Sequence, residues 1–112
     1  MATQTSIGEL VVVLTNEANS TIADKLAKEL LNKRLAACVN LREIKSYFSW
    51  EDKMEEVNEV ELLIKTTRKN LAKVIDVIQC SHTYQVPEIL YWYVSASDKY
   101  LNWVKDVVCS SP

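Results

Sequence analysis

The sequence has very little glycine: Gly8 is the single copy among 112 residues. Loops that wrap a phosphate group with backbone amides need several closely spaced glycines, because only glycine lets the backbone approach so closely. Walker and dinucleotide-binding loops are therefore excluded. Histidine is equally scarce, with His82 as the only copy. No acid partner for it can be identified from the sequence, so no Ser–His–Asp or Cys–His arrangement can be assembled, and we do not expect an enzyme.

Cysteines are few and far apart. Cys38, Cys80 and Cys109 contain no C-x-x-C pair and are odd in number, which argues against a disulfide framework or an intrachain zinc finger. The longest purely apolar run, "LVVVL", is far too short to cross a bilayer. The first ten residues have neither the basic nor the apolar region of a signal peptide. We expect a reduced, cytoplasmic protein with no membrane partner.

An excess of positive charge is also missing. The chain has 15 acidic and 13 basic residues, a net charge of -2, and no basic stripe. Nucleic-acid binding needs clustered Lys and Arg to neutralise phosphates, so nucleic acid is not expected as a partner. Hydrophobic residues make up 48% of the chain, which is enough for one core at this length. Residues 1–112 are predicted to form a single domain.

The first elements are marked by their apolar patterns. Residues 9–15, "ELVVVLT", are continuously apolar and β-branched, which is typical of a strand buried on both faces. Apolar residues then recur at helical spacing as far as Leu31. Thr21 and Asp24 approximate a capping box at the start of this predicted helix.

A long hairpin follows. Residues 36–50 and 54–67 read as extended segments on either side of the turn "WEDK". The apolar alternation of the first segment slips by one residue, which predicts a β-bulge near Arg42 and Glu43. A second helix, a strand over residues 87–94 and a third helix complete the chain.

The order strand, helix, strand, strand, helix, strand, helix predicts an α+β fold. It matches the ferredoxin-like split βαβ sandwich, βαββαβ plus a C-terminal helix, whose helices cover one face of an antiparallel sheet. Strands of about thirteen residues reach roughly 43 Å at about 3.3 Å per residue. A chain of this length has a radius of gyration of only about 13 Å. The hairpin should therefore overhang its own domain.

The predicted hairpin tip carries Tyr47, Phe48 and Trp50. Exposed aromatics on a long strand invite pairing with another chain. Burial against other copies would cover them, so we expect these three residues at a subunit interface. The alternative is a hairpin that curls back over its own sheet.

Three stretches resemble the signature blocks of the CutA family of divalent-cation tolerance proteins. They are "KRLAACVNL" (33–41), "YFSWEDKMEEVNEVELLIKTT" (47–67) and "HTYQVPEIL" (82–90). The resemblance runs from Leu10 to about Val107. It implies a ferredoxin-like homotrimer whose long hairpins pack around a threefold axis. It also implies a role in tolerance of divalent metals, with copper bound by some bacterial members, and no established reaction.

His82 is the candidate ligand for copper or another divalent cation, with Glu88 as the nearby carboxylate. Where some bacterial members have further proposed ligands, this chain has Thr15 and Ser81. Binding is therefore expected to be weak, stronger for copper than for zinc, and lost on acidification. The structural alternative is that His82 only ends the second helix.

The resemblance further implies a polar cleft between subunits, lined by Lys65, Tyr84 and Glu88. Two classes of function remain open. One is a trimeric metal-tolerance protein. The other is a trimeric sensor or interaction scaffold that holds a small anionic ligand near Lys65, or a partner protein, in its clefts. For Lys65 and Glu88 a structural salt bridge is the alternative to a ligand site.

Overall fold

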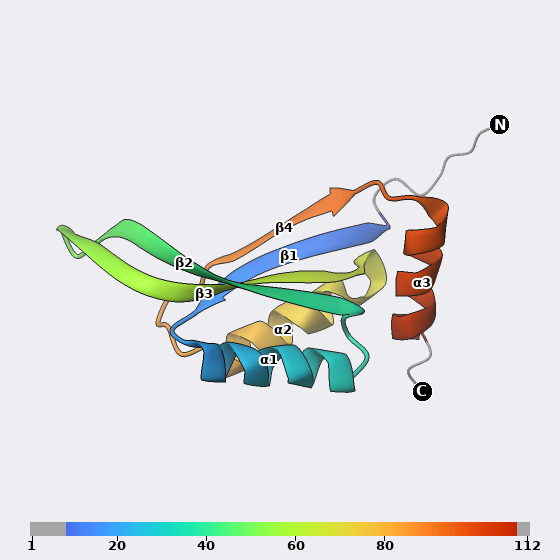
Figure 1. Ribbon diagram of the computed structural model, residues 1–112, viewed down its shortest axis with the longest axis horizontal. Coiled ribbons are helices and arrows are strands. Elements are labelled where there is room, and N and C mark those ends of the chain that lie inside the picture. Colours follow the sequence, from blue (N-terminus) through green and yellow to red (C-terminus); the bar gives the residue numbers. More distant parts are fainter. Residues whose placement is uncertain (1–8, 110–112) are drawn as a thin grey trace.

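The structure, a computed structural model, describes residues 9–109 apart from the side chain of Cys109. These residues form four strands, three α-helices and one short 3-10 helix (Figure 1). In chain order the elements are β1 (Leu10–Glu17), α1 (Ser20–Asn32), β2 (Cys38–Trp50), β3 (Lys53–Thr67), η1 (Arg68–Asn70), α2 (Leu71–Ser81), β4 (Ile89–Val94) and α3 (Asp98–Cys109).

The strands form one antiparallel sheet in the order β2-β3-β1-β4. Helices α1 and α2 lie against one face of this sheet, and the other face carries no helix of the described chain (Figure 1). This is the predicted ferredoxin-like arrangement. Helix α3 lies across the end of the sheet at which β1 begins. There Leu101, Val104 and Val108 pack around Leu10 in a small second core.

The main core lies between the sheet and the two helices. Helix α1 buries one apolar side because its small and branched residues recur every three or four positions. Alternate residues of β1 and β3 meet this side from the sheet. The fully or nearly fully buried members from these three elements are Val11, Val13, Ala23, Leu26, Ala27, Leu30, Val60, Leu62 and Ile64.

The start of α1 differs from the prediction. The N-cap is Asn19, whose side-chain oxygen accepts the N–H of Ile22 at 3.0 Å. The capping box at Thr21 and Asp24 is therefore wrong. Asn19 has the extended backbone that an N-cap requires and is among the strongest capping residue types, so the helix begins before Thr21.

The predicted β-bulge near Arg42 and Glu43 is also wrong. Every residue of β2 from Cys38 to Trp50 pairs with one residue of β3 in an unbroken register. The apolar residues change faces for another reason. Near Cys38 the core lies on the helix side, whereas farther along Ser46, Phe48 and Trp50 line a cleft on the opposite face.

The hairpin β2–β3 projects well beyond the helices, at the left of Figure 1. The molecule measures 53 × 30 × 21 Å and has a radius of gyration of 15.3 Å. The radius expected for a globule of this length is about 13 Å, so the predicted overhang is confirmed. The two turn residues, Glu51 and Asp52, both have positive φ, at 52° and 65°. This pattern is typical of the tight type I′ turn that joins long twisted strands.

Candidate functional site

The segment that joins α2 to β4, residues 82–88, is called the connector below. His82 begins it and ends α2: its backbone N–H donates to the Ile78 carbonyl at 2.9 Å, and its own φ and ψ are extended. The imidazole is only 1% exposed. The reading of His82 as the residue that ends the second helix is therefore confirmed.

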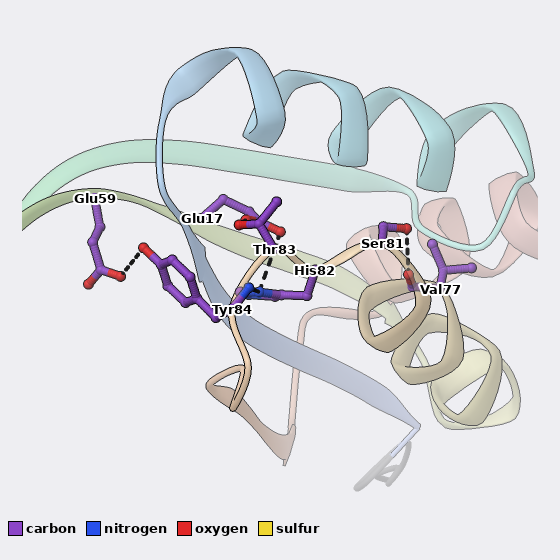
Figure 2. Close-up of polar contacts among 7 residues, drawn as sticks. All are labelled: Glu17, Glu59, Val77, Ser81, His82, Thr83 and Tyr84. Atoms are coloured by element: carbon purple, nitrogen blue, oxygen red, sulfur yellow. Dashed lines mark hydrogen bonds and ion pairs between the residues drawn. The ribbon is translucent and has the colours of Figure 1, made fainter. Parts of the chain in front are cut away.

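The two ring nitrogens of His82 have different surroundings (Figure 2). Nδ1 accepts the backbone N–H of Tyr84 at 3.1 Å, so the proton of the neutral ring lies on Nε2. Nε2 is buried and has no hydrogen-bond partner among the described residues. A metal could therefore bind the ring at Nε2 only if the connector moved and the ring proton shifted from Nε2 to Nδ1, where it would replace the hydrogen bond from the Tyr84 N–H.

Glu17, the last residue of β1, is the acid that lies next to this imidazole. Its side chain is fully buried, with Oε2 at 3.7 Å from His82 Nδ1. The hydroxyl of Thr83 donates to Oε1 at 3.0 Å. No acid partner for His82 was expected from the sequence, and Glu17 was missed. The sequence signal for this residue was a glutamate at the end of an apolar, β-branched strand.

Tyr84 joins the connector to the hairpin. Its hydroxyl donates to Glu59 Oε2 at 2.6 Å, and the two side chains point toward each other in Figure 2. Burial raises the pKa of the Tyr84 phenol, and the hydrogen bond to Glu59 and the charges of Glu59 and Glu17 raise it further. The phenol therefore stays protonated and remains a donor.

Glu88 ties the end of the connector to β1. Its Oε1 accepts the side-chain N–H of Asn16 at 2.6 Å. The amide oxygen of Asn16 is buried and has no partner in the described part of the chain. Burial raises the pKa of the Glu88 carboxyl, and the charges of Glu59 and Glu61 raise it further. The carboxylates at this end of the sheet thus repel one another.

An open cleft of about 800 Å³ lies between the connector and the hairpin. The predicted cleft residues Tyr84 and Glu88 both line it, as do the tip aromatics Tyr47, Phe48 and Trp50. The remaining lining residues come from β1, the hairpin and the connector. They are Asn16, Ser46, Glu55, Val57, Glu59, Thr83, Gln85 and Val86.

Lys65 does not line this cleft within the single chain. It pairs with Cys38 at the opposite end of the β2–β3 ladder, and its amine donates to the side-chain oxygen of Asn40. The salt bridge between Lys65 and Glu88 is accordingly absent from the described contacts of the chain. A contribution of Lys65 to a cleft shared with another subunit stays a prediction.

The metal ligands suggested by the sequence are not assembled into a centre. Within residues 9–109, no three His, Cys, Asp or Glu side chains are grouped so as to hold a metal ion. His82 contacts Glu17 and Tyr84, whereas Glu88 contacts Asn16. A single chain therefore offers one imidazole nitrogen and separate carboxylates, a donor set that fits weak binding only.

The overall form is that of a ferredoxin-like α+β domain with a protruding hairpin, and this form defines the class of protein. Comparison with known proteins then gives the family, since the profile of the CutA1 divalent ion tolerance protein family matches residues 11–107. The chain belongs to this family. None of its described helices is both long and apolar enough to cross a membrane.

Individual relatives support this family assignment. The divalent-cation tolerance protein CutA of Archaeoglobus fulgidus is 39% identical over 87 residues, which are 77% of this chain and 85% of that protein. The protein of the same name from Salmonella newport is 39% identical over 101 residues, 88% of each chain. Neither name denotes a reaction.

The solved structures support the same fold. The structure of the periplasmic divalent cation tolerance protein CutA from Archaeoglobus fulgidus superposes with a TM-score of 0.86 at 33% identity, covering 88% of this chain and 98% of that one. CutA1 from Oryza sativa superposes with a TM-score of 0.85 at 31% identity, covering 91% and 95%.

Proposed function

We propose that this protein acts in divalent-cation tolerance as a cytoplasmic homotrimer that binds copper, or another divalent cation, weakly at the polar end of its cleft. The observation that carries the metal-binding part is the buried, unpartnered Nε2 of His82, behind a cleft whose carboxylates repel one another. Family membership supports the role in cation tolerance.

The trimer is supported by the shape of the chain. The hairpin extends past its own core, and Tyr47, Phe48 and Trp50 on it are exposed. The edge strands of the sheet are β2 and β4. Strand edges and exposed aromatics of this kind are stabilised by pairing with further copies.

The cytoplasm is supported by the thiols. Cys38 and Cys80 are both free cysteines, and free thiols persist in compartments that are kept reducing. Fractionation of cells that produce the full chain tests this assignment, and recovery of the protein outside the cytoplasm would contradict it.

In the metal-bound form, His82 Nε2 and a carboxylate oxygen of Glu88 would be the ligands from one chain. Coordination requires the connector to move, because the imidazole is 1% exposed. This cost makes binding weak. Copper should bind more tightly than zinc, following the usual order of divalent-metal affinities.

The test is a calorimetric titration of Cu²⁺ into wild type and His82→Ala, at pH 7.5 and at pH 5.5. We expect weak binding in wild type at the higher pH, and its loss in the variant and at the lower pH, because protons compete with the metal for the ligand atoms. Equal affinity in all four samples would remove His82 from the site. Ser81→Ala, next to His82 and exposed, is the matched control.

A second candidate is a trimeric small-molecule sensor or interaction scaffold. The observation that favours it is the cleft of about 800 Å³, a size usual for ligand sites. A small anionic ligand is favoured only if Lys65 of another subunit reaches the cleft. A panel of small ligands, screened by thermal shift against the assembled protein, tests this candidate.

A further inference from the structure

Glu17 carries an acceptor that no other described residue uses. Its Oε1 accepts the hydroxyl of Thr83 at 3.0 Å, whereas its Oε2 is buried and has no hydrogen-bond partner among the described residues. Oε2 lies 3.7 Å from Nδ1 of His82, which is too long for a hydrogen bond. A buried carboxylate oxygen without a donor is costly. This atom is therefore poised to accept a proton-bearing group that comes closer.

The imidazole of His82 has a matching gap. Nδ1 accepts the N–H of Tyr84, so the ring proton lies on Nε2, which is buried and without a partner in the described chain. A donor on the ring and an acceptor on the neighbouring carboxylate are thus both unpaired. Glu17, Thr83 and the imidazole lie close together in Figure 2. The nitrogen of the ring that is close to Glu17 is Nδ1.

Each neutral tautomer of the ring pairs with a different neighbour. The Nε2–H form accepts the Tyr84 N–H and leaves Glu17 Oε2 unused. The Nδ1–H form can donate to Oε2 once the 3.7 Å distance closes to about 2.8 Å, the usual length of such a bond to a carboxylate. The same proton displaces the Tyr84 N–H, so this form requires the connector to turn away at Tyr84. The movement that exposes the ring therefore also frees Nδ1 to donate to Glu17.

Regular structure holds both partners in place. Glu17 ends β1, where it pairs with Val60 of β3, and the backbone N–H of His82 donates to the Ile78 carbonyl at 2.9 Å. The side chains of Glu17 and His82 are 0% and 1% exposed within one chain. Their contact is therefore complete inside the chain, and it does not depend on whether another subunit covers the cleft.

We propose that Glu17 is a positioning residue, which stabilises the Nδ1–H tautomer of His82 and so makes Nε2 available as a ligand atom. A histidine that ligates a metal usually donates its other N–H to a carboxylate or carbonyl, and this partner fixes the tautomer and the ring orientation. The proposal deepens the metal-binding function proposed above and rests on it. The effect of Glu17 on the tautomer is nevertheless a property of the metal-free protein, so it can be measured separately.

The tautomer is read directly from the ring. His82 is the only histidine of the chain, so protein labelled with ¹⁵N-histidine reports one ring per subunit. The shifts of the two nitrogens distinguish the two neutral tautomers from each other and from the doubly protonated ring. At pH 7.5 without metal, wild type should be mainly Nε2–H with a minor Nδ1–H fraction. Glu17→Gln should lower that fraction about tenfold, as for the loss of a hydrogen bond to a charged acceptor. Identical ring shifts in the two proteins would overturn the proposal.

Glu29→Gln is the matched control, because it removes the same charge from α1, where Glu29 pairs with Lys33. It should leave the ring shifts of His82 unchanged, and an effect equal to that of Glu17→Gln would overturn the proposal. Circular dichroism checks the fold of each variant. If Glu17→Gln does not fold, Glu17→Asp replaces it: the shorter side chain lies farther from Nδ1 and should also lower the Nδ1–H fraction. An unchanged fraction in that variant would overturn the proposal as well.

The metal-bound protein separates this proposal from the function on which it rests. Calorimetric titration should show Cu²⁺ affinity about tenfold or more weaker in Glu17→Gln and unchanged in Glu29→Gln. Zn²⁺, which is diamagnetic, should convert the wild-type ring to the Nδ1–H form. Binding that requires His82 but is equally strong in wild type and Glu17→Gln would overturn the positioning role and leave the metal function intact. Ring signals that Zn²⁺ does not change, with equal Cu²⁺ affinity in wild type and His82→Ala, would overturn both.

Discussion

The two ends of the β2–β3 ladder have the same backbone pairing and opposite environments. Near the helices, Leu62 pairs with Leu41 and is 0% exposed. Near the tip, Trp50 pairs with Lys53 and is 40% exposed. The register between these positions is unbroken. The difference is therefore in what covers the side chains.

An isolated two-stranded ribbon is only marginally stable in water, because its hydrogen bonds replace bonds to solvent and little apolar surface is buried. The near end is stabilised by α1 and the rest of the sheet. The far end has no such cover within the described chain. This contrast supports the proposal that other copies of the protein complete the tip.

The largest expected effect is at the far end. Trp50→Ala should destabilise the assembled protein by about 3–5 kcal/mol if the indole is buried between subunits as in a core. Melting should then begin at a lower temperature and depend more steeply on protein concentration. The control is Met54→Ala, because Met54 is also at the tip and is 77% exposed. Unchanged melting of the Trp50 variant would mean that the indole is exposed in solution.

At the near end, Leu62→Ala should cost about 2–5 kcal/mol, because it leaves a cavity under α1. Its cross-strand partner Leu41 is largely outside the core, so Leu41→Ala should cost much less. Urea denaturation of both variants measures the difference. Similar losses would contradict the assignment of the two residues to different environments.

Removal of the Tyr84 hydroxyl tests the link between connector and hairpin. Tyr84→Phe leaves Glu59 Oε2, in a buried residue, without its donor and should cost about 1–3 kcal/mol. Tyr91→Phe, in an exposed residue of β4, is the control. If the two variants have the same free energy of unfolding, the hydrogen bond to Glu59 contributes nothing to stability.

The smallest effect concerns pH. The pKa of Glu88 is raised by burial and by its acidic neighbours, so its contribution to stability is present at low pH and is lost as pH rises through the folded-state pKa. Glu88→Gln should therefore raise the melting temperature slightly at neutral pH, and the gain should disappear on acidification. A gain that grows as the pH falls would have the wrong sign.

The fold could be predicted because each element carries its own periodicity. The continuous apolar run over residues 9–15 predicted the first strand, and the apolar stripe that ends at Leu31 predicted the first helix. The length of the two hairpin segments predicted the overhang. The predicted bulge failed for a physical reason. The apolar residues of β2 change face without a change of register, because a cleft replaces the core on the other side of the sheet.

The site was only partly predictable. Tyr84 and Glu88 lie close in sequence and both line the cleft of the single chain, whereas their place in a cleft between subunits stays a prediction. The acid next to His82 was missed because Glu17 is remote: its bond to Thr83 joins positions 66 residues apart. Lys65 was assigned to the cleft by family resemblance. The local sequence does not indicate which end of the β2–β3 ladder lies near the connector.

The central claim, that the hairpin is completed by other copies, is tested most directly by the mass of the protein in solution. Size-exclusion chromatography with light scattering at micromolar concentration should give three times the mass of one chain for wild type. Trp50→Ala should shift this mass toward one chain as the protein is diluted. A wild-type mass of one chain across the same concentrations would contradict the account.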